Sequence, residues 1–280
     1  MSKLKNYANF IKFEHTLFSL PLIFAGTFLA TKGLPDWKLL VLIVLAGTGA
    51  RTSALAINRI LDCRIDALNP RTEDRELPSG KISLTKAYFI TALGLFLYFM
   101  SAYLICDLVL YLSPIPLVVF IIYPLMKRFT PLCHLGVGLG LALAPLGGWV
   151  AVTCSFEGIL PALVLSLFTL CWVSGFDIIY ATLDEEFDKR AGIYSMVSVY
   201  GRDIALMVSS ALHQGAFFFI AFLYFFMFRS IVAGVFLVLI GALLFLEHRK
   251  AENVDLSFFK INILVGLAIF LFVLSGIYLP

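Results

Sequence analysis

The sequence predicts an all-α integral membrane protein, and three observations lead to this fold class. Hydrophobic residues make up 61% of the 280 residues, whereas charged residues make up only 14%. A soluble domain carries about 25% charged residues, so this chain has too few charges to cover a water-facing surface. The apolar residues gather in runs close to the ~20 residues that a helix needs to cross a bilayer. Third, the basic residues between these runs are distributed unevenly, as described below.

Nine apolar runs are predicted to form membrane-spanning helices. In chain order they cover residues 16–32, 38–61, 85–105, 108–126, 133–153, 159–180, 203–227, 230–247 and 260–279. The first run follows several lysines, as the core of a signal peptide would, but many further spans come after it. We therefore expect it to be an uncleaved first helix. The expected organisation is one polytopic membrane domain over residues 1–280.

The distribution of Lys and Arg predicts the orientation of these spans, because these residues gather in cytoplasmic loops. If the N-terminus is inside, the outer side holds only Lys32, Lys38 and Arg229, while Arg51 lies within the second span. All other basic residues are then on the inner side. The sequence thus predicts a protein of the cell inner (cytoplasmic) membrane with its N-terminus in the cytoplasm and its C-terminus outside.

Two connections are long and polar, namely residues 62–84 and 181–202, and both are predicted to be cytoplasmic. Each follows an even-numbered span, and the Asp-rich ends of spans two and six lie about 120 residues apart. This recurrence predicts two four-helix halves plus a ninth helix. Such an arrangement would bring the two polar ends together across the bundle.

Two clusters of acidic residues lie at the cytoplasmic ends of the second and sixth spans. The first contains Asn58, Asp62 and Asp66, and the second contains Asp177, Tyr180, Asp184 and Asp188. Their spacings keep each cluster close to one helical face. A helix C-terminus already carries partial negative charge, so carboxylates stacked there need a compensating cation. Oxygen ligands of this kind suit Mg²⁺, which also binds substrate phosphate. The clusters therefore predict magnesium-dependent chemistry on a diphosphate.

Basic residues near the clusters are candidates for binding phosphate. Arg71 and Arg75 directly follow the first cluster, and Lys127 lies in the next cytoplasmic loop. Arg51 lies two helical turns before Asn58 on the same face, and a charge at membrane depth is usually paired or functional. Its partner could be the carboxylate of an acceptor substrate or an Asp of the protein.

The remaining polar residues carry weaker predictions. No two of the five cysteines share a CxxC spacing, so we expect all of them to pack as small apolar residues. His134 is expected to be a loop histidine and His213 a polar contact in the core. The fifth span contains Gly136, Gly138, Gly140, Gly147 and Gly148, which predict close helix packing. The net charge of +3 is too small to indicate a nucleic-acid partner.

The two clusters resemble the paired motifs of the UbiA superfamily of intramembrane aromatic prenyltransferases. Residues 58–66, from Asn58 to Asp66, resemble its NxxxDxxxD motif, and residues 177–188 match its DxxYxxxDxxxD motif. Residues 71–80 and 123–128 are similar to its next two basic cytoplasmic loops. The chain departs from the family where Arg59 follows Asn58, because many relatives have Asp there, and where Glu76 replaces a common Pro. The 4-hydroxybenzoate polyprenyltransferase branch is the most similar.

The resemblance implies a central cavity surrounded by nine helices and capped on the cytoplasmic side. It implies that polyprenyl diphosphate donates its prenyl chain to a hydroxylated aromatic acid, 4-hydroxybenzoate in ubiquinone-type quinone synthesis. The reaction would take place within the bilayer and without an obligate protein partner. It implies diphosphate binding by Asn58, Arg71, Arg75 and Lys127, acceptor binding by Arg51, and Mg²⁺ binding by Asp62, Asp66, Asp177, Asp184 and Asp188. The candidate catalytic residues are Asp62, Tyr180, Asp184 and Asp188, and either of the last two could accept the ring proton.

Three other functions remain open on the sequence. A dihydroxynaphthoate acceptor would move the same chemistry to menaquinone synthesis. A secondary transporter would place its charges near the membrane midplane, whereas these Asp clusters lie at helix ends. A phosphatidyltransferase acting on other diphosphate substrates would need a different Asp pattern on one pair of helices.

Overall fold

The computed structural model describes residues 3–11, 16–31, 33–249 and 260–279, and these ranges contain helices and no strand. The helices are α1 (Lys3–Phe10), α2 (Thr16–Thr31), α3 (Trp37–Asp66), α4 (Leu84–Ile105), α5 (Asp107–Leu112), α6 (Pro114–Met126), α7 (Cys133–Thr153), α8 (Leu160–Ala181), α9 (Glu185–Ala191), α10 (Met196–Tyr200), α11 (Arg202–Leu223), α12 (Ile231–Arg249) and α13 (Asn262–Tyr278). A 3₁₀ turn, η2 (Thr182–Asp184), joins α8 to α9, and a π turn, η3 (Tyr224–Phe228), extends α11. The all-α prediction is confirmed for the described residues.

Seven helical segments in the described part are long and apolar enough to cross a membrane. They are Trp37–Asp66, Leu84–Ile105, Asp107–Met126, Cys133–Thr153, Leu160–Ala191, Arg202–Phe228 and Ile231–Arg249. Two shorter apolar helices, Ser19–Thr31 and Asn262–Tyr278, fall within the first and last predicted spans. Each predicted span therefore coincides with an apolar helix, whereas nine full crossings and two four-helix halves stay predictions.

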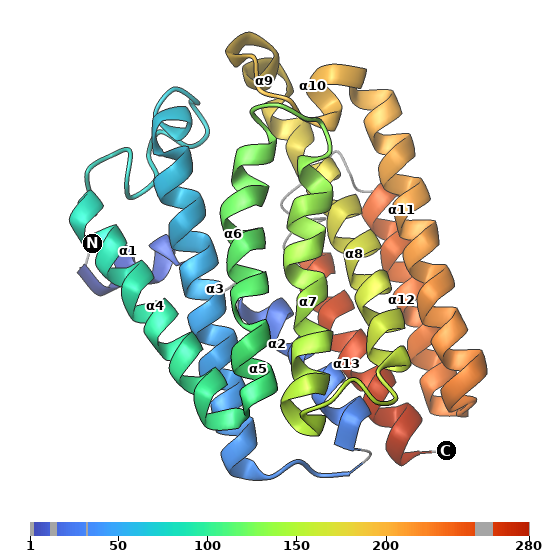
Figure 1. Cartoon of the computed structure of the whole chain (residues 1–280). Coiled ribbons are helices and arrows are strands. Elements are labelled where there is room, and N and C mark those ends of the chain that lie inside the picture. Colours follow the sequence, from blue (N-terminus) through green and yellow to red (C-terminus); the bar gives the residue numbers. More distant parts are fainter. Residues whose placement is uncertain (1–2, 12–15, 32, 250–259, 280) are drawn as a thin grey trace.

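The helices stand side by side and run between the two ends of the bundle (Figure 1). Helix α7 packs against α2, α6 and α8, and its glycines allow close approach at three places. A Cβ on Gly138 would lie 2.1 Å from Ser174 Oγ, and one on Gly148 would lie 2.2 Å from the Ile23 carbonyl oxygen. Gly136 is similarly close to α6, at 2.8 Å from Tyr123 Cβ. The predicted close packing is confirmed at these three glycines.

Two helix boundaries differ from the prediction. Helix α3 continues to Asp66, five residues beyond the predicted end at residue 61, so both Asp residues of the first cluster lie on its last turns. The prediction stopped where the apolar residues stop, although the backbone hydrogen bonds continue. The predicted span 108–126 is divided at Ser113 into α5 and α6, because Pro114 has no N–H to continue the helix.

Segment 67–83 and helices α9 and α10 lie at the same end of the bundle, at the top of Figure 1. Gly192 directly follows helix α9 and caps its C-terminus. Its φ of +67° is a left-handed conformation that glycine adopts without steric cost. The chain then turns toward α10, and the Tyr194 N–H donates to the Lys127 carbonyl oxygen at 2.8 Å. This hydrogen bond joins the second polar connection to the loop between α6 and α7.

The cysteine prediction was wrong for two of the five residues. Cys106, at the end of α4, and Cys154, at the end of α7, form a disulfide across 48 residues of sequence. Each helix begins at the Asp-rich end of the bundle, so the disulfide lies at the opposite end. The sequence could not indicate this pairing, because it depends on which helix ends meet. Cys63, Cys133 and Cys171 are free and partly buried.

Candidate active site

The last turns of α3 hold the first Asp cluster, and each carboxylate there has a basic partner from another segment. Asp62 accepts from Lys127 Nζ at 2.6 Å, and Asp66 accepts from Arg75 Nη1 at 2.8 and 2.9 Å. Both Asp side chains are buried. Leaving a buried carboxylate without a partner is costly, so these pairs allow α3 to keep its acidic C-terminal end inside the protein.

Arg71 connects the two clusters. Its guanidinium donates to both carboxylate oxygens of Asp184, with a distance of 2.8 Å from Nε to Oδ1. The same side chain donates from Nη1 to the Tyr180 hydroxyl at 2.7 Å. Asn69 donates to Asp184 Oδ1 at 2.8 Å, and its own Oδ1 accepts from the Arg71 backbone N–H at 2.9 Å. The segment that follows the first cluster is thereby anchored on the second.

The electrostatic environment keeps Arg71 charged. Burial by itself lowers the pKa of this guanidinium. The hydrogen bonds and charge from Asp184 and Tyr180 raise the pKa by more than burial lowers it. The pKa of Arg71 therefore lies above its ordinary value. A permanently charged, forked donor of this kind suits carboxylate and phosphate oxygens equally well.

Asp177 belongs to the second cluster but has a different partner. Its Oδ2 lies 2.7 Å from Nδ1 of His134, and His134 Nε2 accepts from the Met196 backbone N–H at 3.2 Å. His134 is buried in the first turn of α7. The expectation of a loop histidine was therefore wrong, because His134 is the second residue of α7 and its ring contacts Asp177 of α8. The expectation that His213 is a core polar contact is confirmed, since its buried ring bonds to the Trp172 carbonyl and to His248.

The two remaining cluster residues lie beside the ion pairs. Asp188 is buried on α9, and its side chain interacts with Ser195. Asn58 is half-buried on α3 and interacts with the side chain of Tyr123 from α6. All residues of both predicted motifs thus lie at one end of the bundle. In the second cluster, Asp184 and Tyr180 are linked directly to the segment that follows the first cluster.

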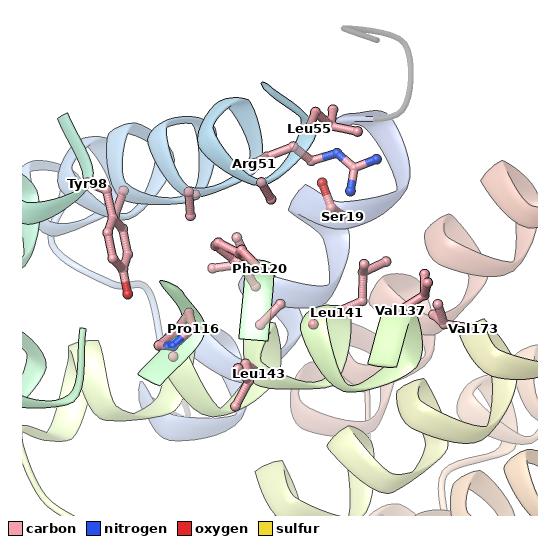
Figure 2. Close-up of a pocket in the computed structure, with 18 of the residues that line it drawn as sticks. Ser19, Arg51, Leu55, Tyr98, Pro116, Phe120, Val137, Leu141, Leu143 and Val173 are labelled. Carbon is pink, nitrogen blue, oxygen red and sulfur yellow. The ribbon is translucent and has the colours of Figure 1, made fainter. Parts of the chain in front are cut away.

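An apolar cavity of about 300 Å³ lies beside the clusters. Residues from α2 to α8 line it, and Arg51 and Asp177 are its charged members. Figure 2 shows the Arg51 side chain reaching from α3 toward Ser19 of α2, with apolar side chains such as Phe120 and Leu141 beyond them. At a rise of 1.5 Å per residue, Arg51 lies about 10 Å below Asn58 along α3. Gly140 and Gly147 also line the cavity, so they do not serve the close packing predicted for them.

The donor set of the clusters fits magnesium, although the described residues form no preformed cage. Among the described residues, no three His, Cys, Asp or Glu side chains meet in a metal-binding group. Mg²⁺ usually takes only one or two carboxylates and completes its shell with water and substrate phosphate. The five Asp residues provide such ligands, and three of them, Asp62, Asp66 and Asp184, are now paired with Lys or Arg side chains.

Sequence reasoning gave no role at the site to two of the residues that organise this end of the bundle, Asn69 and His134. Asn69 precedes a proline in a polar segment and gives no signal of its own. His134 gives a usable signal in retrospect, because it and Asp177 lie near the ends of two consecutive, antiparallel spans that the sequence predicts to be on the same side. Two polar residues at similar depth on neighbouring spans are candidates for a direct contact.

Comparison with known proteins assigns the family. The model of the UbiA prenyltransferase family matches residues 19–276. A 4-hydroxybenzoate octaprenyltransferase of Vibrio parahaemolyticus is 32% identical over 74% of this chain and 73% of its own length. The structure of a UbiA homolog from Aeropyrum pernix matches with a TM-score of 0.85 and 33% identity, covering 95% of this chain and 98% of the homolog.

A UbiA homolog from Archaeoglobus fulgidus, bound to GPP and Mg²⁺, has the same fold with a TM-score of 0.76 at 21% identity, over 97% of this chain and 98% of that one. An all-helical bundle with two Asp motifs at one end, beside an apolar cavity, is the architecture of a membrane-embedded prenyltransferase. The chain belongs to the UbiA prenyltransferase family. It is an enzyme similar to the 4-hydroxybenzoate octaprenyltransferases.

Proposed function

We propose that this enzyme transfers a polyprenyl group from polyprenyl diphosphate to the ring of 4-hydroxybenzoate, with Mg²⁺, in ubiquinone-type quinone synthesis. The observation that carries the proposal is the position of Arg71, which joins the second Asp cluster to the segment following the first, beside an apolar cavity. The names of the relatives and the GPP and Mg²⁺ in the Archaeoglobus structure support the same chemistry.

The charged end would bind the diphosphate. Arg71, Arg75 and Lys127 now neutralise Asp184, Asp66 and Asp62. In the complex these cations, together with Asn58, would turn to the diphosphate oxygens, while Asp62, Asp66, Asp177, Asp184 and Asp188 hold the metal. Tyr180 would keep Arg71 in place through its hydroxyl. Magnesium, when bound, supplies charge neutralisation for the leaving diphosphate.

The apolar cavity would hold the acceptor ring and the start of the prenyl chain. Arg51 lies on its wall and would bind the acceptor carboxylate, the role expected from the sequence. Asp177 is the one carboxylate among the cavity-lining residues of the described part. Asp177 is therefore our candidate for the carboxylate that contacts the acceptor ring. Asp184 and Asp188, the candidates from sequence, do not line the cavity. An apolar wall also keeps water from the allylic cation that forms as the C–O bond breaks.

The orientation that we propose has the Asp clusters and the N-terminus on the cytoplasmic side of the inner membrane, with segments 62–84 and 181–202 as active-site loops. The distribution of basic residues supports it. The Cys106–Cys154 disulfide supports it independently, because disulfides persist on the oxidising, outer side.

The test uses detergent-purified protein with Mg²⁺, geranyl diphosphate and 4-hydroxybenzoate, and mass spectrometry of the products. We expect prenylated 4-hydroxybenzoate that disappears when EDTA is added. Product with a dihydroxynaphthoate but none with 4-hydroxybenzoate would move the enzyme to menaquinone synthesis. Failure with every aromatic acceptor would contradict the proposal.

A further inference from the structure

His134 uses both of its ring nitrogens in contacts with other elements. Nδ1 lies 2.7 Å from Asp177 Oδ2 on α8, and Nε2 accepts the Met196 backbone N–H at 3.2 Å. Because Nε2 accepts a hydrogen bond, the ring proton lies on Nδ1 and is donated to Asp177. The ring is 3% exposed, so water does not compete for either nitrogen.

The Met196 contact ties this pair to the connection between α9 and α10. Met196 is the first residue of α10. Two residues earlier, the Tyr194 N–H donates to the Lys127 carbonyl oxygen, and the Tyr194 carbonyl accepts from the Cys133 thiol. Lys127 in turn binds Asp62. The start of α7 thus contacts two parts of the site. One is the second Asp cluster, and the other is the segment before α10, which is joined to the first Asp cluster through Lys127.

We propose that His134 is a positioning residue, which fixes one oxygen of Asp177 through Nδ1 and anchors the start of α10 through Nε2. This inference rests on the proposed function, because it makes His134 the partner that orients a magnesium-binding and cavity-facing carboxylate. With Oδ2 held by the ring, the other oxygen of Asp177 keeps a fixed direction for metal or substrate. Partners that orient metal ligands in this way typically contribute about 10- to 100-fold to metal affinity or activity.

A histidine serving only to fill space would not need both nitrogens, and substitution can separate the two contacts. The amide nitrogen of Asn lies close to where Nδ1 of His lies, so His134→Asn keeps the donor to Asp177 and loses the acceptor for Met196. The amide of Gln reaches the position of Nε2, so His134→Gln keeps an acceptor for Met196 and loses the Asp177 contact. His134→Leu loses both contacts and fills a similar volume.

The first measurement is the Mg²⁺-dependent binding of geranyl diphosphate by calorimetry, without any aromatic acceptor. We expect His134→Gln and His134→Leu to weaken binding by about 10- to 100-fold, and His134→Asn to bind much as the wild type does. The second measurement is amide hydrogen exchange at Met196 in metal-free protein. There we expect faster exchange in His134→Asn and His134→Leu, and wild-type protection in His134→Gln.

Equal binding by the Asn and Gln variants, or equal exchange at Met196 in the two, would overturn the positioning role. That result differs from failure of the proposed function, in which the wild-type protein itself binds no prenyl diphosphate with Mg²⁺. In that case the positioning role falls with the proposed function. A variant that does not fold is identified by its thermal unfolding in detergent, and each folded variant is then compared with wild type. Wild-type binding by a folded His134→Gln variant, or wild-type exchange at Met196 in a folded His134→Asn variant, would overturn the positioning role.

Discussion

At the scale of single residues, three of the five carboxylates of the site, Asp62, Asp177 and Asp184, are held by groups distant in sequence. Asp184 is bound by Arg71, 113 residues earlier, and Asp177 by His134, 43 residues earlier. The spacing within each motif predicted which side chains share a helical face, because that depends on local geometry. It could not predict these pairings, because they depend on how α3, α7 and α8 pack.

The bidentate contact of Arg71 leads to a prediction for Arg71→Lys. We expect kcat/KM for prenyl transfer to fall by about 10- to 100-fold, because hydrogen bonds to charged groups are each worth about 1.5–3 kcal/mol and Lys lacks the forked geometry. The measurement is steady-state kinetics with geranyl diphosphate and 4-hydroxybenzoate. Arg229→Lys, the same change at an exposed site on the opposite end of the bundle, is the matched control. Equal kinetics for both variants would contradict the role of Arg71.

At the scale of elements, the glycines of α7 divide into two groups. Gly136, Gly138 and Gly148 meet neighbouring helices, while Gly140 and Gly147 face the cavity. Composition alone predicted small residues at helix contacts, which holds for the first group. The sequence could not separate the two groups of glycines, because both lie on the same apolar helix. Which glycines face the cavity depends on where the other helices pack around α7.

This division predicts different effects of adding one methyl group to α7. A Cβ at position 138 would lie 2.1 Å from Ser174 Oγ and 2.6 Å from the Leu170 carbonyl oxygen, so Gly138→Ala must push α7 and α8 apart. We expect a loss of about 1–3 kcal/mol of stability from overpacking, seen as a lower Tm in detergent.

Gly140→Ala is the control, because its Cβ would meet its nearest neighbours only at 3.9 and 4.0 Å. A Tm for Gly138→Ala that equals or exceeds that of Gly140→Ala would show that the α7–α8 contact is looser than described.

Helix boundaries mark the limit of prediction at this scale. In the described part of the chain, each apolar run falls on an apolar helix, because burial in lipid requires apolar side chains. The runs missed the extension of α3 to Asp66, since the last turns of that helix lie in the charged end and are satisfied by ion pairs rather than by lipid. The predicted span 108–126 also ran unbroken across Ser113, although Pro114, a residue type that kinks membrane helices, was visible in the sequence.

At the scale of the whole molecule, the bundle has two chemically distinct ends. Carboxylates and basic residues gather at one end, and the Cys106–Cys154 disulfide closes the other. The positive-inside pattern predicted the first end from sequence, whereas the disulfide came only from the structure. Both features support the proposed orientation, in which the first end faces a reducing compartment and the second an oxidising one.

Thiol labelling in intact cells tests this orientation. In Cys106→Ser the released Cys154, which is exposed, should react with a membrane-impermeant maleimide added outside, and in the wild type it should react only after reduction. Cys133, at the Asp-rich end, serves as the internal control and should react only after permeabilisation. Labelling of Cys154 that requires permeabilisation would reverse the proposed orientation.

The central claim is that the two Asp clusters act together on one diphosphate, and the most direct measurement is a double-mutant cycle on binding. It uses Asp66→Asn, Asp184→Asn and the double variant, with calorimetry of a non-hydrolysable prenyl diphosphate analogue in the presence of Mg²⁺. The account predicts that each single change weakens binding strongly and that the double change costs less than the sum, because residues that share a ligand are not independent. Binding by either single variant at wild-type affinity, or strictly additive losses, would contradict it.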